Sequence, residues 1–139
     1  DYTERLISDY CLADNVRSIG SFPYLEALAR MQAYDLLVLL EAKLDQGIFF
    51  ASKFTDYLQS GKPVWAISPV SGFAKDILSG HKGEYLSDNT DVESIYTQLK
   101  LIVDNWKQGS LQQTDSSLIF KNFSAHAVVS KYKSIVGLN

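Results

Sequence analysis

Two short apolar runs constrain the fold of this chain more than any other feature. Leu36–Leu40 has the sequence L-L-V-L-L and Val64–Ile67 has V-W-A-I, and neither run alternates with polar residues. Such runs are typical of strands that are covered on both faces, as in parallel sheets. Residues 47–63, which lie between them, contain a glycine turn, a helical stretch and a Gly-Lys-Pro stop. A strand, a helix and a second strand in this order predict a parallel pair.

The same alternation continues along the rest of the chain. Further strands are predicted at residues 16–19 and at residues 84–86, the second of them at an edge of the sheet. Helices are predicted at residues 3–12, after Ser21-Phe22-Pro23, at residues 73–78 and 92–106, and after a Ser124 cap. This alternation predicts one α/β domain over residues 1–139, with a Rossmann-like parallel sheet and helices on both of its faces.

Some apolar and capping residues have specific expected places. Trp65 and Trp106 lie in apolar segments and are expected in the core rather than as stacking platforms. The stretch from Thr90 to Glu93 has the pattern of a capping box at the start of a helix. The last helix presents four apolar residues at helical spacing: Val128, Val129, Tyr132 and Ile135.

Composition and charge exclude several classes of protein. Of the 139 residues, 46% are hydrophobic and 21% are charged, which is enough to bury a core and is unlike a disordered chain. A net charge of -3 and a pI near 5.3 argue against general nucleic-acid binding. No apolar run approaches the roughly 20 residues that span a bilayer, and no signal peptide is expected. The single Cys11 cannot form an internal disulfide, which fits a cytoplasmic location.

Three glycine-containing loops are expected to share one rim of the sheet. They are residues 20–22, 41–47 and 68–72, and each follows a predicted strand and precedes a predicted helix. In an open parallel sheet, ligands bind beyond the carboxyl ends of the strands. The helix that begins after Gly47 also offers unpaired N–H groups and a partial positive charge, where a phosphate can bind. Together the loops could supply backbone donors for phosphates, an aromatic edge for a base and carboxylates for sugar hydroxyls.

Other interpretations of individual residues remain open or lack support. Lys53 and Asp56, three residues apart, are by spacing alone more simply an ordinary surface pair on a helix. His81, His126 and Cys11 have no metal-ligand spacing, so no metal site is expected. No G-x-S-x-G, Walker A or G-x-G-x-x-G pattern occurs, so the hydrolase, P-loop and dinucleotide-binding signatures are missing.

The order of these segments resembles a known family. The patterns N-V-R-x-x-G at residues 15–20 and S-K-x-x-D-Y-L-x-S-G-K-P-V at residues 52–64 occur here in sequence. In this combination the chain resembles the C-terminal half of GT-B glycosyltransferases, and most closely the retaining group often called family 4. The resemblance spans residues 4–106.

The resemblance implies a partial C-terminal donor-binding domain, with the first strands of such a domain lacking. The substrate implied is a nucleotide sugar, a UDP- or GDP-sugar, from which a hexose passes to a glycan or lipid-linked acceptor in polysaccharide or glycoconjugate biosynthesis. The acceptor is implied to bind a separate N-terminal domain, so this piece alone is expected to be inactive. No cofactor, metal or nucleic-acid partner is implied, and the location is cytoplasmic, with peripheral association at the inner face of the membrane left open.

Five site residues at the central helix follow from the resemblance. Asp56 occupies the position of the second glutamate of the family's E-x7-E motif, which holds the donor ribose. Gly47 and Ile48 occupy the positions where backbone amides approach the donor sugar or its phosphates. Ser52 and Lys53 lie at the start of the same helix and are expected to contact the diphosphate.

The remaining donor contacts fall on two loops. Ser21 and Phe22 match the loop that touches the base. Ile48 stands where the family has its first motif glutamate, so contacts to the sugar hydroxyls are expected from backbone groups, or from Asp45 or Gln46. No catalytic residue is assigned. The departure at Ile48 supports an alternative in which the chain is a non-catalytic α/β interaction module or a degenerate nucleotide-binding module.

Overall fold

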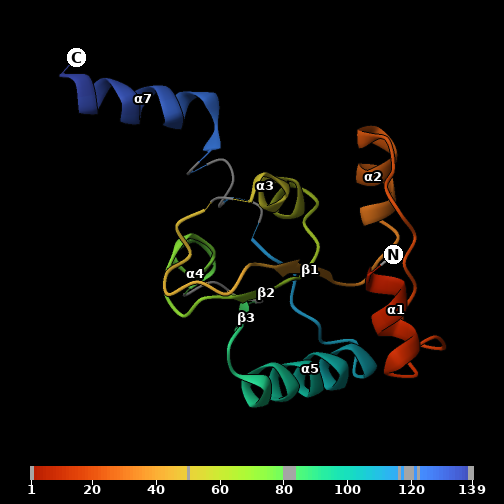
Figure 1. The fold of residues 1–139 in the computed structure, drawn as a ribbon. Helices are drawn as coiled ribbons and strands as arrows, with labels where there is room; N and C mark the ends of the chain where they lie inside the picture. The colour runs from red at the N-terminus through yellow and green to blue at the C-terminus, as the bar shows by residue number, and fades with distance from the viewer. Residues whose placement is uncertain are drawn as a thin grey trace.

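A three-stranded parallel sheet forms the centre of the structure (Figure 1). The structure is a computed structural model that describes residues 2–49, 51–79, 84–115, 117, 121 and 123–137. The strands β1 (Leu37–Leu40), β2 (Val64–Ser68) and β3 (Glu84–Asp88) pair in the order β1-β2-β3. The predicted parallel sheet is therefore confirmed, and β3 lies at an edge, as predicted.

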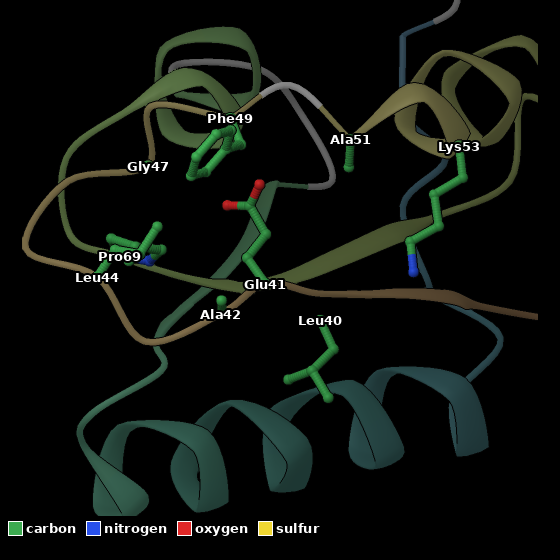
Figure 2. A pocket seen from close by; sticks show the side chains of 9 residues that line it. All are labelled: Leu40, Glu41, Ala42, Leu44, Gly47, Phe49, Ala51, Lys53 and Pro69. Atoms are coloured by element: carbon green, nitrogen blue, oxygen red, sulfur yellow. The ribbon is translucent and has the colours of Figure 1, made fainter.

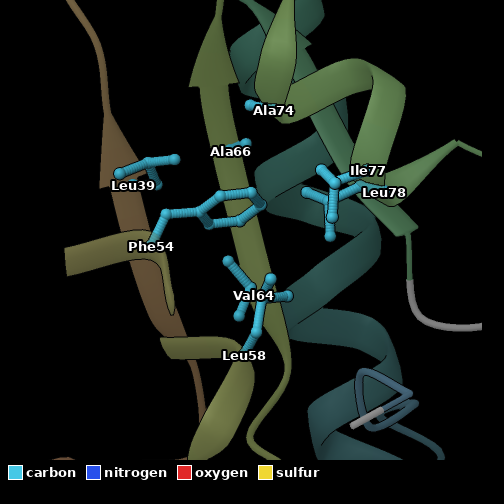
Figure 3. Packing of buried hydrophobic residues seen from close by; sticks show 8 residues of the cluster. All are labelled: Leu39, Phe54, Leu58, Val64, Ala66, Ala74, Ile77 and Leu78. Atoms are coloured by element: carbon cyan, nitrogen blue, oxygen red, sulfur yellow. The ribbon is translucent and has the colours of Figure 1, made fainter. Parts of the chain in front are cut away.

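Two helices cover one face of the sheet. α3 (Ser52–Gln59) connects β1 to β2, and α4 (Phe73–Leu78) connects β2 to β3. Apolar side chains of these helices pack on the inward residues of β1 and β2 (Figure 3). The buried cluster consists of Leu39, Phe54, Leu58, Val64, Ala66, Ala74, Ile77 and Leu78. Because all of these side chains are apolar and well buried, this layer fixes how α3 and α4 lie on the strands.

One long helix covers the opposite face. α5 (Val92–Lys107) follows β3, and its Ile102 packs on Trp65 of β2 and Tyr85 of β3. The indole Nε1 of Trp65 donates a hydrogen bond to Ser87 Oγ at 3.0 Å, so the one polar atom of this buried ring is paired. Helices therefore lie on both faces of the sheet, and Trp65 is in the core as predicted.

The prediction that the first apolar run is covered on both faces is wrong. In β1 the burial alternates, because Leu37 and Leu39 face the α3–α4 layer and are buried. Val38 is 42% exposed and Leu40 is 66% exposed. β1 is an edge strand, and the buried cluster between the sheet and α5 is formed by Trp65 of β2 and Tyr85 of β3 rather than by Val38 or Leu40.

The predicted strand at residues 16–19 is not formed. α1 (Tyr2–Asp9) and α2 (Tyr24–Met31) lie apart from the three strands in Figure 1, and residues 16–23 between them have no regular structure. The amide of Val16 donates instead to the Leu12 carbonyl at 2.8 Å, in the turn that follows α1. A short segment with β propensity forms a strand only when another strand supplies hydrogen-bond partners, and none lies beside this segment.

Side-chain oxygens cap two of the described helices. Asp91, not Thr90, caps α5 and accepts from the amides of Glu93 and Ser94, so the predicted capping box of Thr90 and Glu93 is wrong. Thr90 instead donates its hydroxyl to Asp88. The predicted Ser124 cap of α7 (Ala125–Val136) is confirmed by its bond from the Ala127 amide.

Two apolar features are more exposed than the sequence suggested. Trp106 is 54% exposed, so its predicted core position is wrong. It lies in the last turn of α5, one turn beyond Ile102, and more than half of the residue is open to solvent. The four spaced apolar residues of α7 are also exposed, and Figure 1 shows this helix projecting away from the sheet. Within the described ranges, no helix is both long enough and apolar enough to cross a membrane.

We expect Gly72→Ala to destabilise the fold more than Gly109→Ala. At Gly72 the backbone has φ +131°, and an added Cβ would lie 2.5 Å from the Cα of Gly47. Such a conformation costs a residue other than glycine about 1–3 kcal/mol even without a clash. At Gly109 (φ +64°) no atom lies within 4 Å of an added Cβ, so only the cost of the left-handed conformation, about 1–2 kcal/mol, applies. Urea unfolding measures both, and equal losses would contradict the close contact.

Candidate functional site

A cavity of about 280 Å³ opens where β1 and β2 end, at the rim predicted to bind ligands. Its walls come from the loop after β1, the start of α3 and the loop after β2 (Figure 2). The lining residues that matter for its chemistry are Glu41, Gly47, Phe49, Ala51, Lys53 and Pro69. The cavity thus combines one carboxylate, one lysine and a glycine backbone with apolar side chains.

The two loops of the rim are joined by their backbones. The Gly47 amide donates to the Ser71 carbonyl at 2.8 Å, and the Phe73 amide donates to the Gly47 carbonyl at 3.2 Å. Gly47 and Gly72 form a parallel bridge beyond the end of the sheet. Because a side chain at Gly72 would overlap Gly47, only glycine there allows this approach. The bridge fixes the loop of residues 41–47 against the loop of residues 68–72.

Among the side chains that line the cavity, that of Glu41 has the most unusual surroundings. It is the first residue after β1, and its amide donates to the Ile67 carbonyl at 3.0 Å. Its Oε2 is buried and has no hydrogen-bond partner in the described part of the chain. Burial raises the pKa of this carboxyl, and the charge of Lys53 opposes that rise. A buried acceptor without a partner costs about 1–3 kcal/mol, so this oxygen reduces the stability of the fold.

Asn89 positions Glu41 from behind the rim. Its side-chain nitrogen Nδ2 donates to the carbonyl of Glu41 at 3.2 Å and to that of Ala42 at 2.9 Å. The backbone amide of Asn89 donates to the Ser68 carbonyl at 3.1 Å, and the residue is only 5% exposed. Asn89 therefore connects the ends of all three strands, with its side chain bonded to the loop after β1 and its backbone amide bonded to the end of β2.

Neither Glu41 nor Asn89 was singled out from the sequence, although a signal for both existed. Each is a polar residue at the carboxyl end of a strand, Glu41 directly after β1 and Asn89 directly after β3. Strand ends of a parallel sheet meet at one edge, which brings the two residues together. The role of Asn89 depends on the exact end of β3. The sequence predicts that this strand ends at residue 86, two residues before its end in the structure.

The start of α3 contributes the positive side of the cavity. Ser52 begins the helix, and Ala51 at the N-cap position has no side-chain oxygen to accept from the first turn. The first amides of α3 therefore lack a side-chain cap, and the helix dipole adds a partial positive charge there. Lys53 lines the cavity with Gly47, so two of the predicted site residues lie together.

Asp56 does not lie in this cavity. Its Oδ1 accepts a hydrogen bond from the Tyr24 hydroxyl at 3.0 Å, and this bond raises the pKa of Tyr24. It lines a separate cavity of about 180 Å³ between α2 and α3. The ordinary surface pair with Lys53 is not formed, since Lys53 faces the first cavity. Asp56 instead holds α2 to α3, together with the bond from Gln32 Nε2 to the Ser60 carbonyl.

The other predicted residues are dispersed. Ile48 is 72% exposed, and its amide donates to the Gln46 carbonyl at 2.9 Å, in a tight local turn. Ser21 is exposed, and the ring of Phe22 lies under the guanidinium of Arg30, 3.9 Å from the ring centroid. The lining of the cavity of Glu41 and Lys53 includes none of the predicted residues Gln46, Ile48, Ser21 and Phe22.

Metal binding and known relatives add no further assignment. In the part of the chain that the structure describes, no group of three or more His, Cys, Asp or Glu residues is placed to hold a metal ion. His81 lies outside that part. No protein-family model, curated protein or solved structure matches the chain.

We expect Glu41→Gln to remove a pH dependence of stability. Because burial raises the pKa of Glu41 in the folded state, folding favours its protonated form. That contribution is complete below the ordinary carboxyl pKa of about 4.3 and is lost as the pH rises through the raised value. The free energy of unfolding of Glu41→Gln should therefore increase relative to the original chain between pH 4 and pH 7. Urea unfolding at both values tests this, with Asp104→Asn as the charge control on α5.

We expect Asn89→Ala to destabilise the loops of residues 41–47 and 68–72 at the carboxyl edge of the sheet. The substitution leaves the Glu41 and Ala42 carbonyls without their buried donor, which should cost about 1–3 kcal/mol of unfolding free energy. Amide NMR shifts should change most in residues 41–47 and 68–72. Asn15→Ala, at an exposed position after α1, is the control. A loss equal to that of the control would contradict the positioning role of Asn89.

Proposed function

We propose that this chain is the donor-binding part of a glycosyltransferase, and that the cavity between the loop after β1 and the start of α3 takes the diphosphate end of a nucleotide sugar. The observation that carries the proposal is the meeting of Gly47 and Lys53 in one cavity at the carboxyl edge of a parallel sheet. The segment order that resembles GT-B enzymes agrees with this placement.

The electrostatics of the cavity suit an anion. The uncapped N-terminus of α3 and the ammonium of Lys53 both present positive charge to it. In transfer from a nucleotide sugar, negative charge develops on the departing diphosphate. Positive groups held in place before reaction stabilise that charge, and this is a large term in catalysis by such sites. Lys53 therefore has the role of stabilising the leaving group, and no group that attacks the sugar is assigned.

The nucleoside would extend from this cavity toward α2. Asp56, between α2 and α3, is the candidate for the ribose, whose hydroxyls would replace the Tyr24 hydroxyl as donors to its carboxylate. Ser21 and Phe22 precede α2 and are the candidates for the base. A hexose would pass to a glycan or lipid-linked acceptor held by an N-terminal domain, in the cytoplasm or at the inner face of the membrane.

Two observations favour a second function. The carboxylate of Asp56 already has a partner in Tyr24, and the exposed Ile48 supplies no carboxylate at the start of the motif. Both features suit a module that keeps the fold of a donor-binding domain without binding a donor. Nucleotide binding separates the two functions, because the second predicts none.

We expect UDP or GDP to bind this chain and to shift the amide NMR signals of residues 41–53. Lys53→Met should lower the affinity about tenfold or more, since a hydrogen bond to a charged group contributes about 1.5–3 kcal/mol. Lys107→Met, at the end of α5, removes the same charge at a distance and should leave the affinity unchanged. Titration with UDP, GDP and ADP makes the comparison. An absence of shifts with all three would favour the second function.

A further inference from the structure

The carboxylate of Glu41 has no task in the diphosphate contact. An anionic side chain beside a phosphate weakens its binding, yet Glu41 lies in the same cavity as Lys53. Its backbone is anchored by the Ile67 carbonyl and by Asn89, and its Oε2 is buried without a partner in the described part of the chain. An acceptor held so firmly and left unpaired is suited to a donor that arrives with the ligand.

We propose that Glu41 recognises the sugar of the donor, and that its carboxylate accepts a hydrogen bond from a hydroxyl of the hexosyl group. This inference rests on the proposed function, because it places the sugar in the cavity that takes the diphosphate. Glu41 is thereby a specificity-determining residue. It recognises the hexosyl hydroxyl groups of a nucleotide sugar, which a nucleoside diphosphate lacks.

The size of the cavity favours a sugar and its phosphate. Sites for whole drug-sized ligands usually measure about 300–1,000 Å³. At about 280 Å³ this cavity is too small for a complete nucleotide sugar and suits one part of it. The apolar walls formed by Phe49 and Pro69 can pack on the carbon face of a sugar ring, while Glu41 and Lys53 contact its polar groups.

The positions of Lys53 and Glu41 determine how a sugar phosphate would be oriented in the cavity. Lys53 extends from α3 on one side of the cavity, and the carboxylate of Glu41 rises from the end of β1 (Figure 2). A sugar whose phosphate lies at Lys53 and the start of α3 therefore has its ring hydroxyls near Glu41. A Cβ on Gly47 would lie only 3.6 Å from Oε2, so glycine at that position keeps the space beside the oxygen open.

Charge argues against a cationic ligand beside Glu41. A cationic ligand would be repelled by Lys53 across the same space. A ligand that donates neutral hydroxyls and also carries negative charge satisfies both side chains, and a sugar phosphate has this chemistry.

The test compares affinities with and without the sugar. Calorimetry or NMR titration gives Kd for UDP and UDP-glucose, and in parallel for GDP and GDP-mannose. In the original chain the sugar should tighten binding about tenfold or more. Glu41→Met, which removes both oxygens at a similar length, should abolish this gain and leave the Kd of the nucleoside diphosphate unchanged or slightly lower. Glu41→Gln, which keeps one neutral acceptor, should retain part of it.

Two further variants make the test specific. Asp104→Asn removes an exposed carboxylate of α5 and should keep the full gain from the sugar. Asp45→Asn removes the other carboxylate of the loop, which is exposed and lies outside the cavity lining, and should keep the gain as well. Dispersed amide spectra of every variant confirm folding.

The outcomes distinguish the two proposals. Nucleoside diphosphates that bind without any gain from the sugar would overturn the role of Glu41 and leave the proposed function standing. The role of Glu41 is likewise overturned if the gain survives in Glu41→Met or is lost in Asp45→Asn. If neither nucleotides nor nucleotide sugars bind the original chain, the proposed function fails and the role of Glu41 fails with it.

Discussion

The contact between the backbones of Gly47 and Gly72 determines the shape of the rim. Parallel strands end where their hydrogen bonds end, and the loops beyond them would otherwise be independent of one another. Here the Gly47–Gly72 bridge and the bonds to Ser71 and Phe73 continue the pairing past β1 and β2. The cavity at the start of α3 is therefore built on backbone contacts of the same kind as those of the sheet.

The polar groups behind this bridge are only partly satisfied. Asn89 uses its nitrogen to hold the loop after β1, while its Oδ1 and the Oε2 of Glu41 are buried without partners in the described structure. Unpaired buried atoms reduce stability and are uncommon in folded proteins. Both lie at the carboxyl edge of the sheet, where the proposed ligand would bind.

The fold followed from the sequence wherever local patterns and burial agreed. The runs that became β1 and β2, the start and end of α4 and the Ser124 cap were all predicted from short stretches of residues. The errors at residues 16–19, β1 and Trp106 share another cause. In each case an apolar segment was expected to pack against a neighbouring element. In the structure that element is missing or covers only part of the segment. Propensity describes a segment, whereas burial depends on what packs against it.

The candidate site shows the same division. The sequence by itself predicted the parallel order of strands and helices and the loops 41–47 and 68–72 at the carboxyl edge of the sheet, whereas the third predicted loop, 20–22, follows no strand. Only the tertiary structure decided that Lys53 lines the same cavity as Glu41, while Asp56 accepts a hydrogen bond from Tyr24. Residues three apart on a helix share a face by spacing, but each side chain contacts the neighbours beside it, and those neighbours come from distant parts of the chain. Spacing identifies which residues share an element, and packing decides which of them share a cavity.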